Sequence, residues 1–80
     1  MKEAILEKLK GIIAEIMKTD VSAVGMDTRL KEDLKADSLD KINMLMALEE
    51  AYDIEMDEEE ALAFQTVGDV VEYLEKEGVE

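Results

Sequence analysis

Apolar residues recur at every third or fourth position through residues 2–17, and this spacing limits the fold more than any other feature of the chain. The stripe consists of Ile5, Leu6, Leu9, Ile12, Ile13 and Ile16. A repeat near 3.6 residues predicts an amphipathic helix that buries one face. The chain has 80 residues and no cysteine. Because no disulfide can assist, a single small core must be built from such faces.

Three further segments show helical spacing. Residues 38–52 form the longest of them, and residues 58–63 form a short one. Thr66 and Asp69 are spaced as a capping box, with aspartate in place of the commoner glutamate or glutamine, and open a last helix that ends near Lys76. The predicted fold class is all-α. Residues 1–80 are expected to form a single domain, a small four-helix bundle with three main helices, a short third helix and a long first loop.

That first loop covers residues 18–37, which show no sustained period. A connection of this length in a small domain is usually functional or held in place by its own side chains. We expect its scattered apolar residues to hold it against the core. These are Val21, Val24, Met26, Leu30 and Leu34.

Negative charge is concentrated in the second half of the chain. Residues 1–36 carry seven basic and seven acidic side chains, whereas residues 37–80 carry fifteen acids against Lys41 and Lys76, which accounts for the net charge of −13. Such a field repels nucleic acid and favours protein partners with basic surfaces. There is no signal-peptide pattern and no membrane-spanning run. We therefore expect a cytoplasmic protein, and we expect it to be a monomer.

Ser38 stands at the predicted start of the second helix. If Asp37 is the N-cap, the third helical position is Asp40, an acid suited to the positive end of the helix; if Ser38 is the N-cap, that position is Lys41. The first assignment is better and leaves the Ser38 hydroxyl free. The chain has no histidine or cysteine, and an unactivated serine is a weak nucleophile. We expect no enzyme activity, and any chemistry at Ser38 must be done by another enzyme.

The second helix carries two apolar faces. At a step of about 100° per residue, one side holds Met44, Leu45, Leu48 and Tyr52. The nearly opposite side holds Leu39, Ile42 and Met46, among Asn43, Glu49, Glu50 and Asp53. An exposed apolar stripe bordered by acids is typical of a partner-binding surface. The alternative is a helix buried on all sides, which would bury several carboxylates.

Residues 33–40 read Asp-Leu-Lys-Ala-Asp-Ser-Leu-Asp, and residues 46–50 read Met-Ala-Leu-Glu-Glu. These two runs closely resemble the acyl carrier proteins of type II fatty acid synthesis. The similarity extends to residues 28–30, 52–55 and 66–70, so it covers nearly the whole chain. The motif Asp-Ser-Leu alone is a weak signal, and this context makes it a strong one.

The resemblance implies a right-handed four-helix bundle that carries acyl chains. In this family a phosphopantetheinyl transferase attaches 4′-phosphopantetheine from coenzyme A to the motif serine, here Ser38 between Asp37 and Leu39. The thiol of the arm carries the acyl chain as a thioester to synthesis enzymes with basic docking surfaces. The family's partner-binding helix maps onto Asp37, Leu39, Asp40, Ile42, Met46, Glu49 and Glu50. The residues expected to shelter the chain, which also have a core role, are Leu45, Leu48, Tyr52, Ile54, Leu62, Val67, Val71 and Leu74.

The sequence departs from the commonest pattern of that family in four places. Lys35 replaces a usual glycine, Asn43 replaces a frequent acid, Lys41 adds a cation, and the junction after Met56 lacks a common proline. A carrier for polyketide, lipid A or another specialised pathway therefore stays open beside fatty acid synthesis. A second alternative is an unmodified acidic helical module that binds partners through the stripe of Ile42 and Met46.

Other chemistries fit the sequence poorly. A calcium-binding loop counted from Asp53 would need a glycine at Glu58 and a glutamate at Phe64. The chain also lacks a zinc-ligand cluster, a glycine-rich phosphate loop and a basic-aromatic patch. No metal site is predicted.

Overall fold

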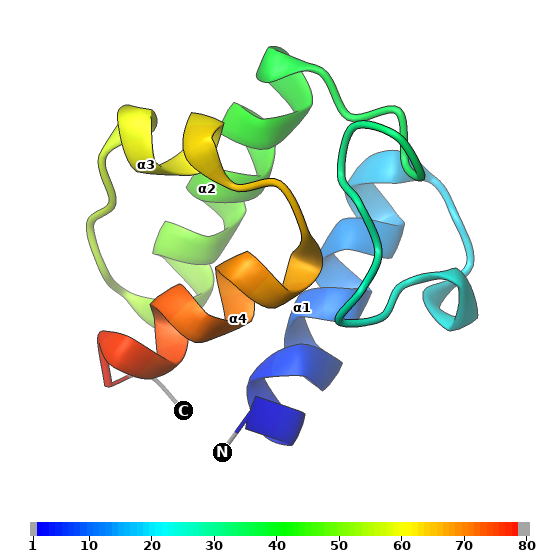
Figure 1. The fold of residues 1–80 in the computed structure, drawn as a ribbon. Coiled ribbons are helices and arrows are strands. Elements are labelled where there is room, and N and C mark those ends of the chain that lie inside the picture. Colours follow the sequence, from blue (N-terminus) through cyan, green and yellow to red (C-terminus); the bar gives the residue numbers. More distant parts are fainter. Residues whose placement is uncertain (1, 79–80) are drawn as a thin grey trace.

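The computed structural model describes residues 2–78, and within them the chain is helical (Figure 1). The helices are α1 at Lys2–Met17, the short 3-10 helix η1 at Val21–Ala23, α2 at Ser38–Tyr52, α3 at Glu58–Ala63 and α4 at Val67–Lys76. The predicted small all-α fold with four α-helices and a long first connection is confirmed. In the described part of the chain, the extended pairing is limited to one isolated antiparallel bridge between Arg29 and Thr66.

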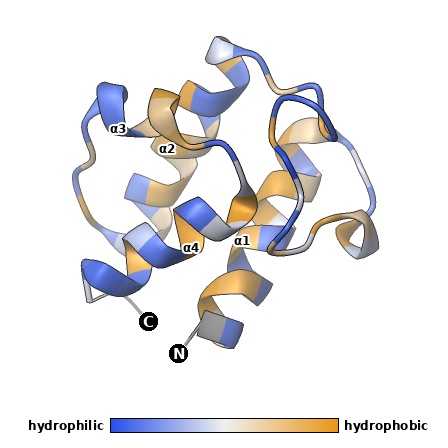
Figure 2. Cartoon of the chain, in the orientation of Figure 1, coloured by the Kyte–Doolittle hydropathy of each residue, from blue (hydrophilic) through white to orange (hydrophobic). Residues whose placement is uncertain are grey.

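The core is centred on α1, which packs against both α2 and α4. Ile5, Leu9 and Ile13 of α1 are fully buried, while Leu6, Ile12 and Ile16 are only partly buried. Ile5, Leu9 and Ile13, which are spaced four residues apart, therefore form the centre of the apolar stripe of α1. The α4 stripe of Val67, Val70, Val71 and Leu74 is buried as predicted. Figure 2 shows hydrophobic positions alternating with hydrophilic ones along both helices. Every buried side chain in the described residues is hydrophobic.

Local hydrogen bonds explain where α4 begins and where α2 ends. The Thr66 hydroxyl accepts from the Asp69 N–H at 3.1 Å, and the Asp69 carboxylate accepts from the Thr66 N–H at 3.2 Å. This is the capping box that the sequence predicted for α4. α2 ends at Asp53, whose φ of 55° is left-handed and whose N–H donates to the Glu49 carbonyl.

Backbone hydrogen bonds tie the first loop to the connection between α3 and α4. Leu30 N–H donates to the Gln65 carbonyl at 2.9 Å, and Val67 N–H donates to the Thr28 carbonyl at 2.9 Å. Gly68 N–H donates to the Met26 carbonyl at 2.8 Å. A Cβ at Gly68 would lie 2.9 Å from that same carbonyl oxygen, so the approach requires glycine.

The apolar residues of the loop behave as expected with one exception. Val24 and Leu30 are buried, and Met26 and Leu34 pack against the core. The expectation for Val21 is wrong, since this side chain is 47% exposed. It belongs to η1, which buries none of its residues and is held by Asp20 accepting from Ser22 N–H. That turn is stabilised locally at the surface and does not need the core.

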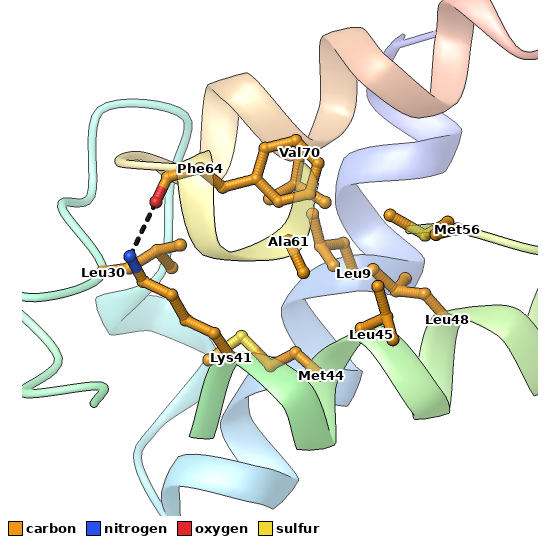
Figure 3. A pocket seen from close by; sticks show the side chains of 10 residues that line it. All are labelled: Leu9, Leu30, Lys41, Met44, Leu45, Leu48, Met56, Ala61, Phe64 and Val70. Atoms are coloured by element: carbon orange, nitrogen blue, oxygen red, sulfur yellow. Dashed lines mark hydrogen bonds between the residues drawn. The ribbon is translucent and has the colours of Figure 1, made fainter. Parts of the chain in front are cut away.

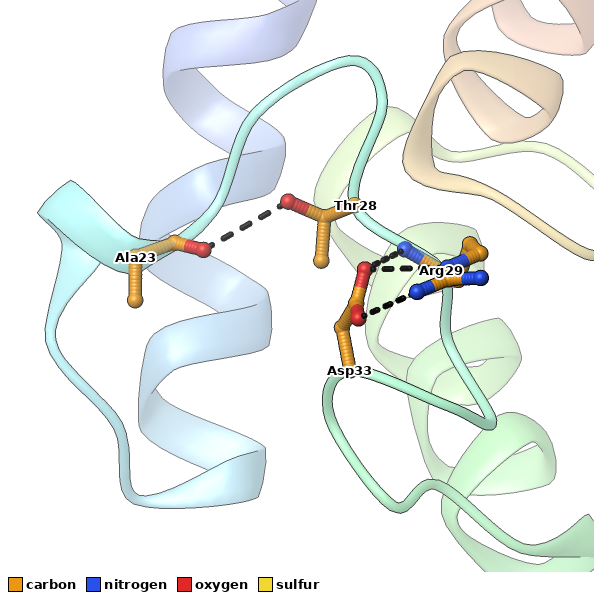
Figure 4. Close-up of polar contacts among 4 residues, drawn as sticks. All are labelled: Ala23, Thr28, Arg29 and Asp33. Atoms are coloured by element: carbon orange, nitrogen blue, oxygen red, sulfur yellow. Dashed lines mark hydrogen bonds and ion pairs between the residues drawn. The ribbon is translucent and has the colours of Figure 1, made fainter.

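Polar contacts within the loop maintain its shape (Figure 4). The Thr28 hydroxyl donates to the Ala23 carbonyl at 3.4 Å. Asp33 accepts from the Arg29 N–H at 2.8 Å and from the Arg29 guanidinium at 3.2 Å. The Arg29 N–H, followed by its guanidinium, lowers the pKa of Asp33 below the usual value. These contacts set the turn that leads into α2.

Candidate functional site

The start of α2 is built by two aspartates on either side of Ser38. Asp37 is the N-cap, as predicted, with extended backbone at φ −92° and ψ −171°. Its carboxylate accepts from the Asp40 N–H at 2.9 Å, and the Asp40 carboxylate accepts from the Asp37 N–H at 3.2 Å. This reciprocal capping box leaves Ser38 as the first residue of the helix. The Ser38 side chain is exposed.

The turn before α2 is tight and directs the chain into the helix. Asp33 N–H donates to the Arg29 carbonyl at 2.9 Å, and Ala36 N–H donates to the Leu30 carbonyl at 2.8 Å. Ala36 is buried, which anchors the turn one residue before the N-cap. Lys35 has φ of 60°, in the left-handed region that favours glycine. Lys35, which stands where carrier proteins usually have glycine, therefore has a backbone conformation that glycine would adopt with less strain.

Ser38 lies in a shallow hollow that suits an anion. Lys31, Ala36, Asp37, Ser38 and Lys41 line the hollow. Within the described residues, the structure gives no acceptor for the N–H groups of Ser38 and Leu39, and such groups at a helix start favour negative charge. Lys31 and Lys41 border the hollow, and the Lys41 ammonium donates to the Phe64 and Leu62 carbonyls. The N–H groups at the helix start favour an anion near Ser38, and the carboxylates of Asp37 and Asp40 oppose one.

The predicted partner-binding residues share one side of α2 but differ in exposure. Leu39 is 67% exposed and Met46 is 56% exposed, whereas Ile42 is half-buried. Glu50 is exposed. Glu49 is half-buried, and its carboxylate accepts from the Met56 N–H at 2.8 Å. Helical spacing could not predict this contact, because Met56 lies in the irregular connection after α2. The partner-binding surface itself stays a prediction.

The core side of α2 faces a small apolar cavity (Figure 3). Its volume is about 10 Å³, and it is lined by Leu9, Leu30, Lys41, Met44, Leu45, Leu48, Met56, Ala61, Phe64 and Val70. Space of that size holds about one water molecule, so the cavity is closed to a longer ligand. Helical spacing identified Met44, Leu45 and Leu48 as core-facing, and they are buried.

The eight residues expected to shelter an acyl chain do not all lie around one cavity in the structure. Leu45 and Leu48 line the cavity. Val67, Val71 and Leu74 are buried in the core, but they do not line it. Tyr52 and Ile54 pack half-buried against the core, and Leu62 is 43% exposed. Met56 and Phe64, which do line the cavity, lie in or beside connections and carried no periodic signal. The role of the eight predicted residues stays a prediction.

Tyr52 has an unusual polar environment. Among the described residues, its buried hydroxyl has no hydrogen-bond partner, and burial raises the pKa of Tyr52. The Lys8 ammonium lies 4.8 Å from the centre of the Tyr52 ring, which is within cation–π range. This contact holds the C-terminal end of α2 against α1.

Residues 7–74 match the family model described as the phosphopantetheine attachment site. That range includes the whole of α2 and the hollow around Ser38. Two further observations concern residues 2–78 alone. No helix there has the length and apolar character needed to cross a membrane, and no group of acidic side chains there is arranged to hold a metal ion.

Proposed function

The chain belongs to the family of phosphopantetheine attachment domains, and on this premise we propose that Ser38 carries the 4′-phosphopantetheine arm. Domains of this family are the site of covalent attachment of that group. The chain has two serines, Ser22 and Ser38. Both side chains are exposed, but the Ser22 hydroxyl donates to Asp20 at 3.0 Å, whereas Ser38 is the first residue of α2. The observation that carries the proposal is this exposed hydroxyl in a hollow with two lysines.

The residues around Ser38 have distinct roles in this proposal. Asp37 and Asp40 cap α2 and hold Ser38 at its first position. The Ser38 oxygen forms a bond to phosphorus and loses its proton to the transferase, while the nucleotide part of coenzyme A leaves. The N–H groups of Ser38 and Leu39 at the start of the helix offset part of the charge of the resulting phosphodiester. Lys31 and Lys41 border the same hollow. The arm supplies a terminal thiol, which this cysteine-free chain lacks.

We further propose that the chain carries acyl groups as thioesters and is not itself an enzyme. Its partners are a phosphopantetheinyl transferase and synthesis enzymes with basic docking surfaces, which suits the net charge of −13. The exposed side chains of Leu39 and Met46, with Glu50 beside them, are the proposed docking stripe. Fatty acid synthesis is the proposed pathway; polyketide and other specialised pathways are the alternatives. A cytoplasmic monomer remains the expectation from the sequence.

The attachment is tested by intact-mass measurement. Purified apo protein is incubated with coenzyme A and a promiscuous phosphopantetheinyl transferase. We expect a mass gain of one phosphopantetheinyl group in the wild type and in Ser22→Ala, the matched control, and no gain in Ser38→Ala. A wild type that gains no mass would contradict the proposal and favour an unmodified interaction module. A gain that persists in Ser38→Ala would place the arm elsewhere.

A further inference from the structure

Lys41 links the helix that bears Ser38 to the end of α3. It lies three residues after Ser38, so both side chains fall on the same side of α2. Its ammonium donates to the Phe64 carbonyl at 2.9 Å, as Figure 3 shows. It also donates to the Leu62 carbonyl at 3.4 Å. Phe64 is the C-cap of α3. We call these two hydrogen bonds the Lys41 clamp.

The Lys41 side chain also separates two spaces. It lines the apolar cavity together with Leu45 and Phe64, and it lines the hollow around Ser38 together with Lys31. Among the described residues it is the only one that lines both. Its aliphatic stem therefore forms the partition between the hollow and the cavity, while its ammonium is held at the carbonyl oxygens.

The cavity is too small for a carried chain in this conformation. Its volume of about 10 Å³ leaves room for roughly one water molecule, so a chain of several methylene groups enters only if its walls separate. α2 and α3 form opposite walls, through Leu45 and Ala61. α3 has six residues, and its N-cap Asp57 makes no side-chain capping bond. The short helix α3 is therefore the wall that moves most easily. The Lys41 clamp holds its C-terminal end, and the Tyr73 hydroxyl donates to Glu60 within it at 3.1 Å.

We propose that Lys41 is the gate between the attachment site and the apolar cavity. An acyl chain carried at Ser38 enters when the ammonium releases the Phe64 and Leu62 carbonyls and the stem swings out of the partition. Lys41 is a positioning residue in this scheme, because it sets how much of a carried chain is sheltered without reacting itself. This inference rests on the proposed attachment at Ser38 and on no further property of the pathway.

The test compares variants loaded with a solvatochromic aliphatic probe as a thioester. Lys41→Met keeps an unbranched stem and removes the ammonium, and Lys41→Arg keeps a cation. Lys31→Met is the matched control, since it removes the same charge beside Ser38 but does not line the cavity. The emission spectrum gives the ratio of sheltered to solvent-exposed probe. Loss of a charge-assisted hydrogen bond predicts about a tenfold higher ratio in Lys41→Met.

The outcomes separate the two proposals. Intact mass first shows whether each variant is loaded at Ser38; failure to load the wild type overturns the attachment proposal. If loading succeeds, a higher ratio in Lys41→Met with wild-type ratios in Lys41→Arg and Lys31→Met supports the gate. An unchanged or lower ratio in Lys41→Met, or an equal rise in Lys31→Met, overturns it. Circular dichroism checks folding, and Lys41→Gln takes the place of Lys41→Met if that variant does not fold.

Discussion

Lys35 occupies a backbone conformation that glycine would adopt with less strain, and the variant Lys35→Gly measures that strain. Its φ of 60° is left-handed. This conformation costs an ordinary L-residue about 1–2 kcal/mol. Glycine removes that cost but gives the unfolded chain more freedom, which costs about 0.4–1 kcal/mol. The midpoints of these two ranges predict a gain of about 0.8 kcal/mol in the free energy of unfolding, which is about 3–6 °C in the melting temperature for a domain of this size.

Lys35→Ala is the matched control for this prediction. It removes the same charge and the same exposed side chain, but it keeps a Cβ in the left-handed conformation. We expect no gain in stability from it. Urea denaturation followed by helical circular dichroism gives both free energies, and equal denaturant slopes confirm that the two variants unfold from comparable states. If Lys35→Gly is no more stable than Lys35→Ala, the strain is absent and the reasoning is wrong.

Two further predictions concern glycine packing and a tyrosine. Gly68→Ala should lower the free energy of unfolding by about 1–2 kcal/mol, because its Cβ would meet the Met26 carbonyl at 2.9 Å. Gly11→Ala, with open space around it in α1, should raise the free energy of unfolding by about 0.5–1 kcal/mol in the same urea denaturation. Equal effects of the two substitutions would refute the close approach. Burial and then the hydrogen bond to Glu60 raise the pKa of Tyr73 to about 12. Since this is above the ordinary value of 10.0, its contribution to stability is complete below pH 10.0 and is lost as the pH rises through about 12. Phenolate absorbance should show Tyr73 titrating at lower pH in Glu60→Gln, and an unchanged titration would exclude the Glu60 contribution.

The helices were predictable because their signals are local. The capping residues Thr66 and Asp69 and the apolar stripe that follows them indicated where α4 lies. At α2, comparing the residues available for capping selected Asp37 over Ser38 as the N-cap. Local pattern also identified the exposed serine. A local pattern does not determine which side chains of an irregular segment face the core, so the expectation that Val21 is buried was wrong.

The contacts that shape the site are long-range and had no local signal. Lys41 reaches carbonyl oxygens more than twenty positions away, and Glu49 caps an N–H beyond the end of its own helix. The cavity wall formed by Phe64 depends on how α3 and α4 are placed. The comparison with the carrier-protein pattern marked Lys41 as an added cation, but only the folded chain shows which carbonyl oxygens the cation binds.

The hydrogen bonds from Leu30, Val67 and Gly68 join the first loop to the chain that leads into α4. A protease needs an extended, mobile stretch of backbone to cut, and this long connection does not offer one between Met26 and Leu30. The Leu30 amide proton, which donates to the Gln65 carbonyl, exchanges with solvent only when the loop separates from the chain that leads into α4. The longest irregular segment in the described chain is thus part of the same cooperative unit as the helical core.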